Sequence, residues 1–263
     1  MKLPTAPYPF VFLSACFSGT WEGKNAQASE LRIPPVRGHL RLWHRVLYSA
    51  NDANRVWGNA AGNEGSGSRV GVTLKLAAPP VSTKAPTLPH KEDRFQGPRA
   101  ALAEGTKASL VLHRLPGCTA VDWEHAQNAT KLWRLLGSIG NRSNRAAGSA
   151  WPDDATAPAS TAELRSQLSA LGCKWALALA PTSVGTTWQS LRKAASDTIK
   201  DAINYGTSTP RTPSPTHFKI VRFGTELRLL VFAANGNRLS SAMSSMAKKP
   251  IPALSKPNEW VEI

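Results

Sequence analysis

The sequence is poor in cysteine and in long apolar runs, and each shortage excludes a class of protein. Its 263 residues include only three cysteines, at positions 16, 118 and 173, and none of them forms a CxxC pair. Widely spaced cysteines in odd number indicate neither a zinc knuckle nor a disulfide framework, and they fit a reducing cytoplasm. No apolar run approaches the roughly 18 residues that a membrane span needs. We therefore expect a cytoplasmic protein that does not span a membrane.

Acidic residues are also scarce. Asp and Glu total 17 against 32 Lys and Arg, which gives a formal net charge of +15. A folded protein with this imbalance repels itself, and an anionic partner is the usual reason for it. Apolar residues make up 41% of the chain, so the composition is that of a folded protein and not of a disordered basic tail. Nucleic acid, an acidic membrane and the ribosome are all candidate partners at this point.

The N-terminal stretch resembles a lipoprotein signal only superficially. Lys2 precedes an apolar run that ends in a small residue before Cys16. A signal peptide needs a more basic start and an uninterrupted apolar helix, whereas prolines occur here at positions 4, 7 and 9. The aromatic and β-branched residues from 8 to 17 instead predict a first β-strand.

Residues 34–48 predict an amphipathic helix with one basic face. At about 100° per residue, the apolar side carries Leu40, Trp43, Val46 and Leu47. The opposite side carries Arg37, Arg41, His44, Arg45 and Tyr48. No acidic residue occurs between positions 31 and 51, although solvated helices usually interleave the two signs. This face therefore favours an anionic partner over ordinary solvated charge.

A glycine-rich stretch at 57–69 ends in Arg69 and precedes a predicted strand. Such a loop can cradle phosphates through its backbone N–H groups, and the alternative is a plain surface loop. It lacks the GxxxxGK[ST] spacing and does not precede a helix, so nucleotide hydrolysis is not indicated.

A second glycine-rich stretch, 137–151, is more specific. Glycines at 137, 140 and 148 surround Arg142 and Arg145, with Asn141, Ser143 and Asn144 between them. Small residues around two arginines suit a backbone that touches a phosphodiester chain. A plain turn would explain the glycines but would leave the arginine pair unexplained.

The order of predicted elements indicates an α+β fold. Alternating apolar residues predict strands at 70–76, 108–115 and 175–179 and a hairpin at 217–234, and helical spacing predicts helices at 122–136, 160–171 and 188–203. Prolines at 79, 80, 86, 89 and 98 mark 77–99 as a long excursion from the core. We expect a βαββαβ ferredoxin-like half at 1–151 and a second α+β half at 152–263.

Catalytic patterns are weak. His90, Glu92 and Asp93 lie together in the proline-rich excursion and could serve a nuclease, but polar neighbours in a loop are common. His113 and His217 lie in predicted strands, where packing or surface positions are the usual role. The spacing of His, Cys and acidic residues fits no metal site, so we expect no catalytic centre, metal or cofactor. Trp57 and Trp151, each beside a glycine loop, are candidates for base stacking.

Four stretches resemble the RAMP superfamily, whose members are subunits of CRISPR effector complexes. Residues 30–45, ELRIPPVRGHLRLWHR, are similar to the family stretch ELRxPSIRGxLRxWWR. Residues 57–58 with 67–70 resemble its FG…SxV segment, and residues 136–149 resemble its GGIGxRSRRGxGS loop, with Asn144 and Ala146 where the family is more basic and has glycine. Ser214-Pro215 and the hairpin after them resemble a late RAMP element. The match is nearest to the first RAMP subunit of the Cmr (type III-B) module, although this chain is shorter, and a subunit of another type III or a type IV complex is the alternative.

The resemblance implies an RRM-like, ferredoxin-like RAMP fold, a modified tandem with a long insertion. It implies an RNA-binding subunit of a type III CRISPR effector that is not an enzyme, with CRISPR RNA, target RNA and other effector subunits as partners. The alternatives are a RAMP endoribonuclease that uses Asp93 or a histidine, and a basic RNA-binding module unrelated to CRISPR. The candidate RNA-binding residues are Arg37, Gly38, Arg41, His44, Arg45, Arg69, Gly140, Asn141, Arg142, Ser143 and Arg145.

Overall fold

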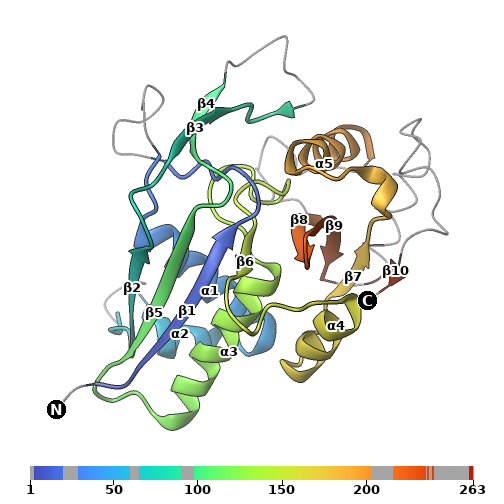
Figure 1. Ribbon diagram of the computed structural model, residues 1–263. Helices are drawn as coiled ribbons and strands as arrows, with labels where there is room; N and C mark the ends of the chain where they lie inside the picture. The colour runs from blue at the N-terminus through green and yellow to red at the C-terminus, as the bar shows by residue number, and fades with distance from the viewer. Residues whose placement is uncertain are drawn as a thin grey trace.

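The computed structural model describes residues 3–19, 29–59, 65–89, 98–202, 216–234, 236, 239 and 261–262. Within these ranges the chain forms two four-stranded antiparallel sheets and one two-stranded sheet, with helices packed against them (Figure 1). The predicted α+β class is confirmed at this level.

The first sheet has the spatial order β2-β5-β1-β6, and all its neighbouring strands are antiparallel. Its strands are β1 (Thr5–Phe12), β2 (Val70–Leu76), β5 (Lys107–Arg114) and β6 (Ala150–Pro152). Its helices are α1 (Ile33–Leu47) and α2 (Ala50–Trp57) after β1, and α3 (Ala120–Leu136) after β5. Phe10 of β1 meets Trp133 of α3 edge to face, with ring centroids 5.1 Å apart, so α3 covers this sheet with aromatic contacts.

The predicted first strand is shifted, because β1 ends at Phe12 and not at residue 17. It also contains Pro7 and Pro9, although proline is unusual in a central strand. The register explains this, since β6 pairs only with residues 10–12 of β1. Both prolines therefore lie where β1 has a neighbour on one side alone.

The second sheet has the spatial order β10-β7-β9-β8 and is also antiparallel. Its strands are β7 (Ala176–Leu179), β8 (Thr216–Phe223), β9 (Glu226–Ala233) and β10 (Val261–Glu262). Along the chain, α4 (Thr161–Ala170) precedes β7, and the short 3-10 helix η4 (Thr182–Val184) and α5 (Trp188–Ala202) lie between β7 and β8. When the strands of each sheet are counted along the chain, both sheets have the same order: fourth, first, third, second.

The proline-rich excursion forms a separate hairpin of β3 (Ser82–Ala85) and β4 (Arg99–Leu102) (Figure 1). It is joined to the body by a backbone bridge: the Cys16 N–H donates to Leu102 O at 3.0 Å, and the Leu102 N–H donates to Cys16 O at 2.9 Å. The segment thus stays out of both large sheets, as its prolines predicted.

Helix α1 contacts strands of both four-stranded sheets. Leu40 and Trp43 are buried, which confirms the predicted apolar face. The Trp43 ring is 5.4 Å from that of Trp175 and 6.1 Å from that of Phe232, so α1 also packs on the second sheet. The sequence pattern did not predict the helix that follows, α2, which begins at the Ser49 cap, where the Asp52 N–H donates to Ser49 Oγ at 3.0 Å. Serine followed by an acidic residue three positions later is an N-cap pattern that could have revealed it.

Candidate nucleic-acid interface

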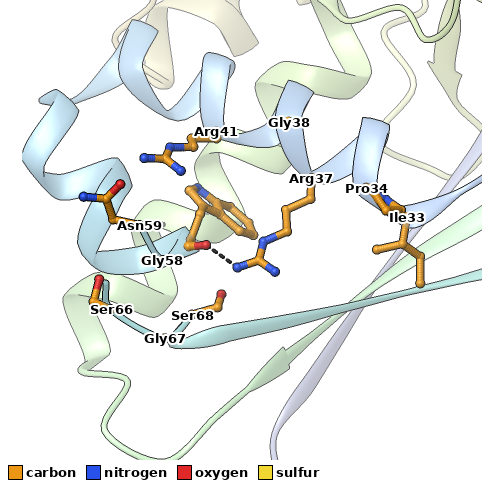
Figure 2. A pocket seen from close by; sticks show the side chains of 11 residues that line it. Ile33, Pro34, Arg37, Gly38, Arg41, Gly58, Asn59, Ser66, Gly67 and Ser68 are labelled. Atoms are coloured by element: carbon orange, nitrogen blue, oxygen red, sulfur yellow. Dashed lines mark hydrogen bonds between the residues drawn. The ribbon is translucent and has the colours of Figure 1, made fainter. Parts of the chain in front are cut away.

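A groove of about 620 Å³ runs between α1, the end of α2 and the segment before β2 (Figure 2). Helix α1 contributes Arg37, Gly38 and Arg41 to its wall. The opposite wall is the backbone of 58–59 and 66–68, where Asn59 and Ser66 exchange two hydrogen bonds of 2.9 Å. Two of the predicted stretches, the basic helix and the loop ending at Arg69, therefore form one surface.

The arginines of α1 are held by neutral oxygens. Arg37 donates to the carbonyl oxygen of Trp57, the last residue of α2 (Figure 2). Arg41 donates to the side-chain oxygen of Asn54, and Arg45 donates to the same oxygen at 3.4 Å. Within the described ranges, none of these three arginines forms an ion pair with a carboxylate. The positive charge of Arg37 and Arg41, which line the groove, is therefore available to a ligand there, and Arg45 lies one turn beyond Arg41.

Arg69 has different surroundings. Its Nη1 lies 2.9 Å from a carboxylate oxygen of Asp122, and Arg55 pairs with the other oxygen of Asp122 at 2.8 Å. Burial alone would raise the pKa of Asp122, but hydrogen bonds from Arg55, Thr119 and Arg69 outweigh it and hold that pKa far below its usual range. The charge of Arg69 is largely compensated within the protein, which makes it a weaker candidate for phosphate than the arginines of α1.

The prediction that His44 lies on the exposed basic face is wrong, because its side chain is fully buried. The Trp57 Nε1–H donates to His44 Nδ1 at 3.0 Å, so the proton of the neutral ring is on Nε2, which donates to Asp52 at 2.9 Å. His125 Nδ1 lies 2.6 Å from the same carboxylate oxygen, and Arg55 pairs with the other. Helix α1 turns His44 inward because α2 packs against that side.

His44, Asp52 and His125 also bring three possible metal-ligand atoms within 4.8 Å of one another. A histidine that binds metal usually donates its second ring N–H to an acceptor. Here the second nitrogen of His44 instead accepts from Trp57. This wiring fits a hydrogen-bond network that fixes α1, α2 and α3 together, and it does not fit a metal site.

The two tryptophans predicted to stack on bases do not lie on the surface. Trp57 and Trp151 are each 1% exposed. Trp57 is the inner wall of the groove and donates to His44, while Trp151 lies in β6 against Phe223. The prediction of base stacking by these rings is wrong, since neither face is accessible to a base.

The glycine loop, residues 137–149 between α3 and β6, is a junction inside the protein. Gly140 has φ +92°, and a Cβ there would lie 2.7 Å from Phe17 O. Gly148 has φ +59°, and a Cβ there would overlap the carbonyl oxygen of Ile139. The sequence predicts that these glycines allow a close approach to RNA, but the close approach that the structure shows is to the chain itself.

The same loop is hydrogen-bonded to β8 of the second sheet. The Ala146 N–H donates to Phe218 O, and the Phe218 N–H donates to Asn144 O, both at 3.1 Å. Beneath the loop the fully buried Lys219 donates to the carbonyls of Arg134 and Gly137 at 2.7 and 2.8 Å. The loop is therefore attached to β8 by backbone hydrogen bonds to Phe218 and by the Lys219 side chain.

The remaining candidates of the loop lie outside the groove. Asn141 is exposed, while Arg142, Ser143 and Arg145 are half-buried. Ser143 lines a small pocket of about 30 Å³ that His39 of α1 and His217 of β8 share. Burial, with a contribution from His39, lowers the pKa of His217 to about 4. His217 is therefore neutral near pH 7 and packs on Phe232 in a stacked geometry.

Asp93, with His90 and Glu92, lies outside the described residues, and so do Ser214 and Pro215. Among the described helices, none combines the length and the hydropathy that crossing a membrane requires.

No protein family model matches the chain, and no curated protein matches it. Solved structures, in contrast, match the chain. The crystal structure of apo Cmr1 from Pyrococcus furiosus aligns with a TM-score of 0.58 at 14% identity, over 88% of this chain and 88% of that one. The fold is similar to that of Cmr1.

Two chains of the Type III-B Cmr-beta complex also align with this chain. In the structure bound to cognate target RNA, the TM-score is 0.51 at 12% identity, over 89% of this chain and 94% of that one. In the structure that also contains AMPPnP, in the presence of ssDNA, it is 0.54 at 10% identity, over 93% and 99%. The fold is thus similar to that of Cmr1 and of chains in the Type III-B Cmr-beta complex, as the sequence resemblance predicted.

Proposed function

We propose that this chain is an RNA-binding subunit of a type III CRISPR effector complex, and that it holds CRISPR RNA or the guide–target duplex. The observation that carries the proposal is the arginine row of α1, Arg37, Arg41 and Arg45, which faces or flanks the groove and is held by neutral oxygens. Uncompensated arginines beside an open backbone wall suit the phosphates of a nucleic acid.

The fold supports the same proposal. The order β1, helices, β2, β5, α3, β6 with a fourth-first-third-second sheet is the order expected for a ferredoxin-like βαββαβ unit, and it supports this part of the proposal. The second sheet repeats this order, so we propose a modified ferredoxin-like tandem with halves near 1–151 and 152–263. The fold is similar to that of chains from two structures of the Type III-B Cmr-beta complex, both described as bound to cognate target RNA.

Within this function, the groove of α1 is the primary RNA surface, and Gly38 leaves room in it. Asn141, Arg142, Ser143 and Arg145 would be a second surface on the exposed side of the glycine loop. Other effector subunits would be the protein partners.

Isolation of the tagged chain from its native host tests this function. We expect other effector subunits and repeat-derived RNAs to be recovered with it. Recovery with ribosomal RNA alone, or without any RNA, would overturn the proposal in favour of an unrelated basic module.

We also propose that the chain does not cut RNA. The test is incubation of the protein with labelled CRISPR RNA and complementary target, with and without Mg²⁺. We expect no defined products. Defined cuts that disappear in Asp93→Ala would show instead that the chain is a nuclease.

A further inference from the structure

Side chains of two helices, α1 and α2, determine how much positive charge a ligand in the groove would meet. Helix α1 supplies Arg41 and Arg45 one turn apart, and α2 supplies Asn54, whose side chain meets both of them. Two guanidinium groups, which can only donate, converge on one atom of this amide, so that atom must be the oxygen. Asn54 is half-buried, and it is the residue of α2 that contacts the arginine row through its side chain.

The acidic side chain of α2 faces away from the groove. Asp52 accepts from His44, His125 and Arg55 on the inner side of the helix. Trp57 lies three residues after Asn54 and thus on the same side of α2. The only acceptor that Trp57 presents is its carbonyl oxygen, to which Arg37 donates a hydrogen bond. The side of α2 that meets the arginine row therefore presents neutral acceptors alone.

Neutral and charged acceptors have opposite consequences for a ligand. A carboxylate would fix the arginines equally well, but it would cancel the charge that a phosphate needs, as Asp122 does for Arg69. An amide oxygen fixes a guanidinium through one hydrogen bond and leaves its charge and its other donors unused.

We infer that Asn54 is a positioning residue of the RNA-binding groove: one neutral oxygen holds Arg41 and Arg45 side by side and leaves their charge for phosphates. This inference rests on the proposed function, because it assigns a role within the same groove.

The test compares substitutions at Asn54 by the salt dependence of RNA binding. Asn54→Asp keeps the shape and places one carboxylate beside both arginines. Its single negative charge offsets one of their two positive charges, so about one phosphate of the RNA would no longer be neutralised. With single-stranded RNA of mixed sequence as the probe, the slope of log K against log salt should fall by roughly 0.7. Over the decade from 1 M to 0.1 M salt this reduces the gain in affinity by about 5-fold.

Asn54→Ala separates positioning from charge. It removes the shared acceptor but leaves both arginines charged, so the slope should stay at the wild-type value. The affinity should fall by about 2- to 10-fold, the cost of ordering side chains that are no longer held. Neither variant should unfold the protein, and Asn54→Asp should melt at the wild-type temperature or above, because it adds two ion pairs.

Asn51→Asp is the matched control, since it adds the same charge to an exposed position of the same helix. It should bind RNA with the wild-type slope. An equal loss of affinity in Asn51→Asp and Asn54→Asp would overturn the inference, because the effect would then be general repulsion. A wild-type slope in a folded Asn54→Asp would overturn it as well.

Arg41→Ala, measured in the same titrations, distinguishes failure of this inference from failure of the proposed function. If Arg41→Ala weakens binding and flattens the slope while Asn54→Asp does not, only the role of Asn54 is wrong. If Arg41→Ala binds RNA as the wild type does, the groove is not the RNA surface and both proposals fail.

Discussion

Gly38 of α1 and Gly148 of the glycine loop both belong to stretches in which glycine accompanies arginine, but their surroundings are opposite. A Cβ at Gly38 would meet nothing within 4 Å, and Gly38 lines the groove. A Cβ at Gly148 would overlap the carbonyl oxygen of Ile139. The first glycine keeps a surface open, and the second lets two parts of the backbone pack together. The same motif chemistry therefore serves a candidate interface in one place and a junction in the other.

The largest effect is expected at the junction. Gly148→Ala should reduce the free energy of unfolding by about 3 kcal/mol or more, because it combines a left-handed backbone with a steric overlap. Urea unfolding measures this. Gly224→Ala is the matched control, since Gly224 has φ +60° with nothing within 4 Å of a Cβ, and it should cost about 1 kcal/mol. Equal costs for the two variants would show that the glycine loop is not tightly packed.

Lys219 should affect stability and not the salt dependence of RNA binding. Lys219→Met leaves the carbonyls of Arg134 and Gly137 without their donor, which should cost about 2 kcal/mol. Lys174→Met, at an exposed position, should change the free energy of unfolding by less than about 0.5 kcal/mol. A flattened salt slope in folded Lys219→Met would mean that the junction takes part in RNA binding.

Acid should destabilise the network of carboxylates beneath the groove. Burial alone would raise the pKa of Asp52, but hydrogen bonds from His44 and His125 outweigh burial and lower this pKa. The pKa of Asp122 is lowered too. A carboxylate with a lowered pKa in the folded state stabilises the fold above its unfolded pKa of about 4, and this stability is lost as the pH falls below that value. The melting temperature should therefore drop between pH 5 and pH 3, by a smaller amount in Asp122→Asn. An equal drop in that variant would contradict the assignment.

The smallest effect is expected in the groove, and it has opposite signs for folding and binding. Gly38→Ala should stabilise the protein by up to about 1 kcal/mol, because glycine is a poor helix former and the added methyl group meets no atom of the chain. If Gly38 keeps the groove open for RNA, the same variant should bind RNA several-fold more weakly. Thermal melting and RNA titration of one sample measure both, and unchanged binding would remove Gly38 from the interface.

The apolar side of α1 and most elements were predictable from sequence, because both depend on local periodicity. Leu40 and Trp43 are buried as the helical spacing requires, and β2 spans the predicted 70–76. The polar side was less predictable, since His44 turns inward only because α2, a helix that the sequence pattern did not predict, packs beside it. Partners far apart in the chain, such as Arg69 and Asp122, are set by tertiary packing.

The glycine loop shows a further limit of motif-based prediction. Ala146 stands where the family pattern has glycine, and its φ is +59°. The pattern therefore records a backbone that favours glycine for conformational reasons, and spacing alone cannot tell this need from a close approach to RNA. Asn54 gave no signal at all, because an amide that holds two arginines matches no motif.

The salt dependence of RNA binding in Arg37→Ala/Arg41→Ala tests most directly whether the α1 groove holds RNA. We expect a folded protein with weaker binding to single-stranded RNA and a slope smaller by roughly 0.7 for each phosphate that the arginines no longer neutralise. Lys131→Ala/Lys174→Ala removes the same charge from exposed positions elsewhere and should keep the wild-type slope. An unchanged slope in the folded arginine variant, or an equal change in the lysine variant, would contradict the account.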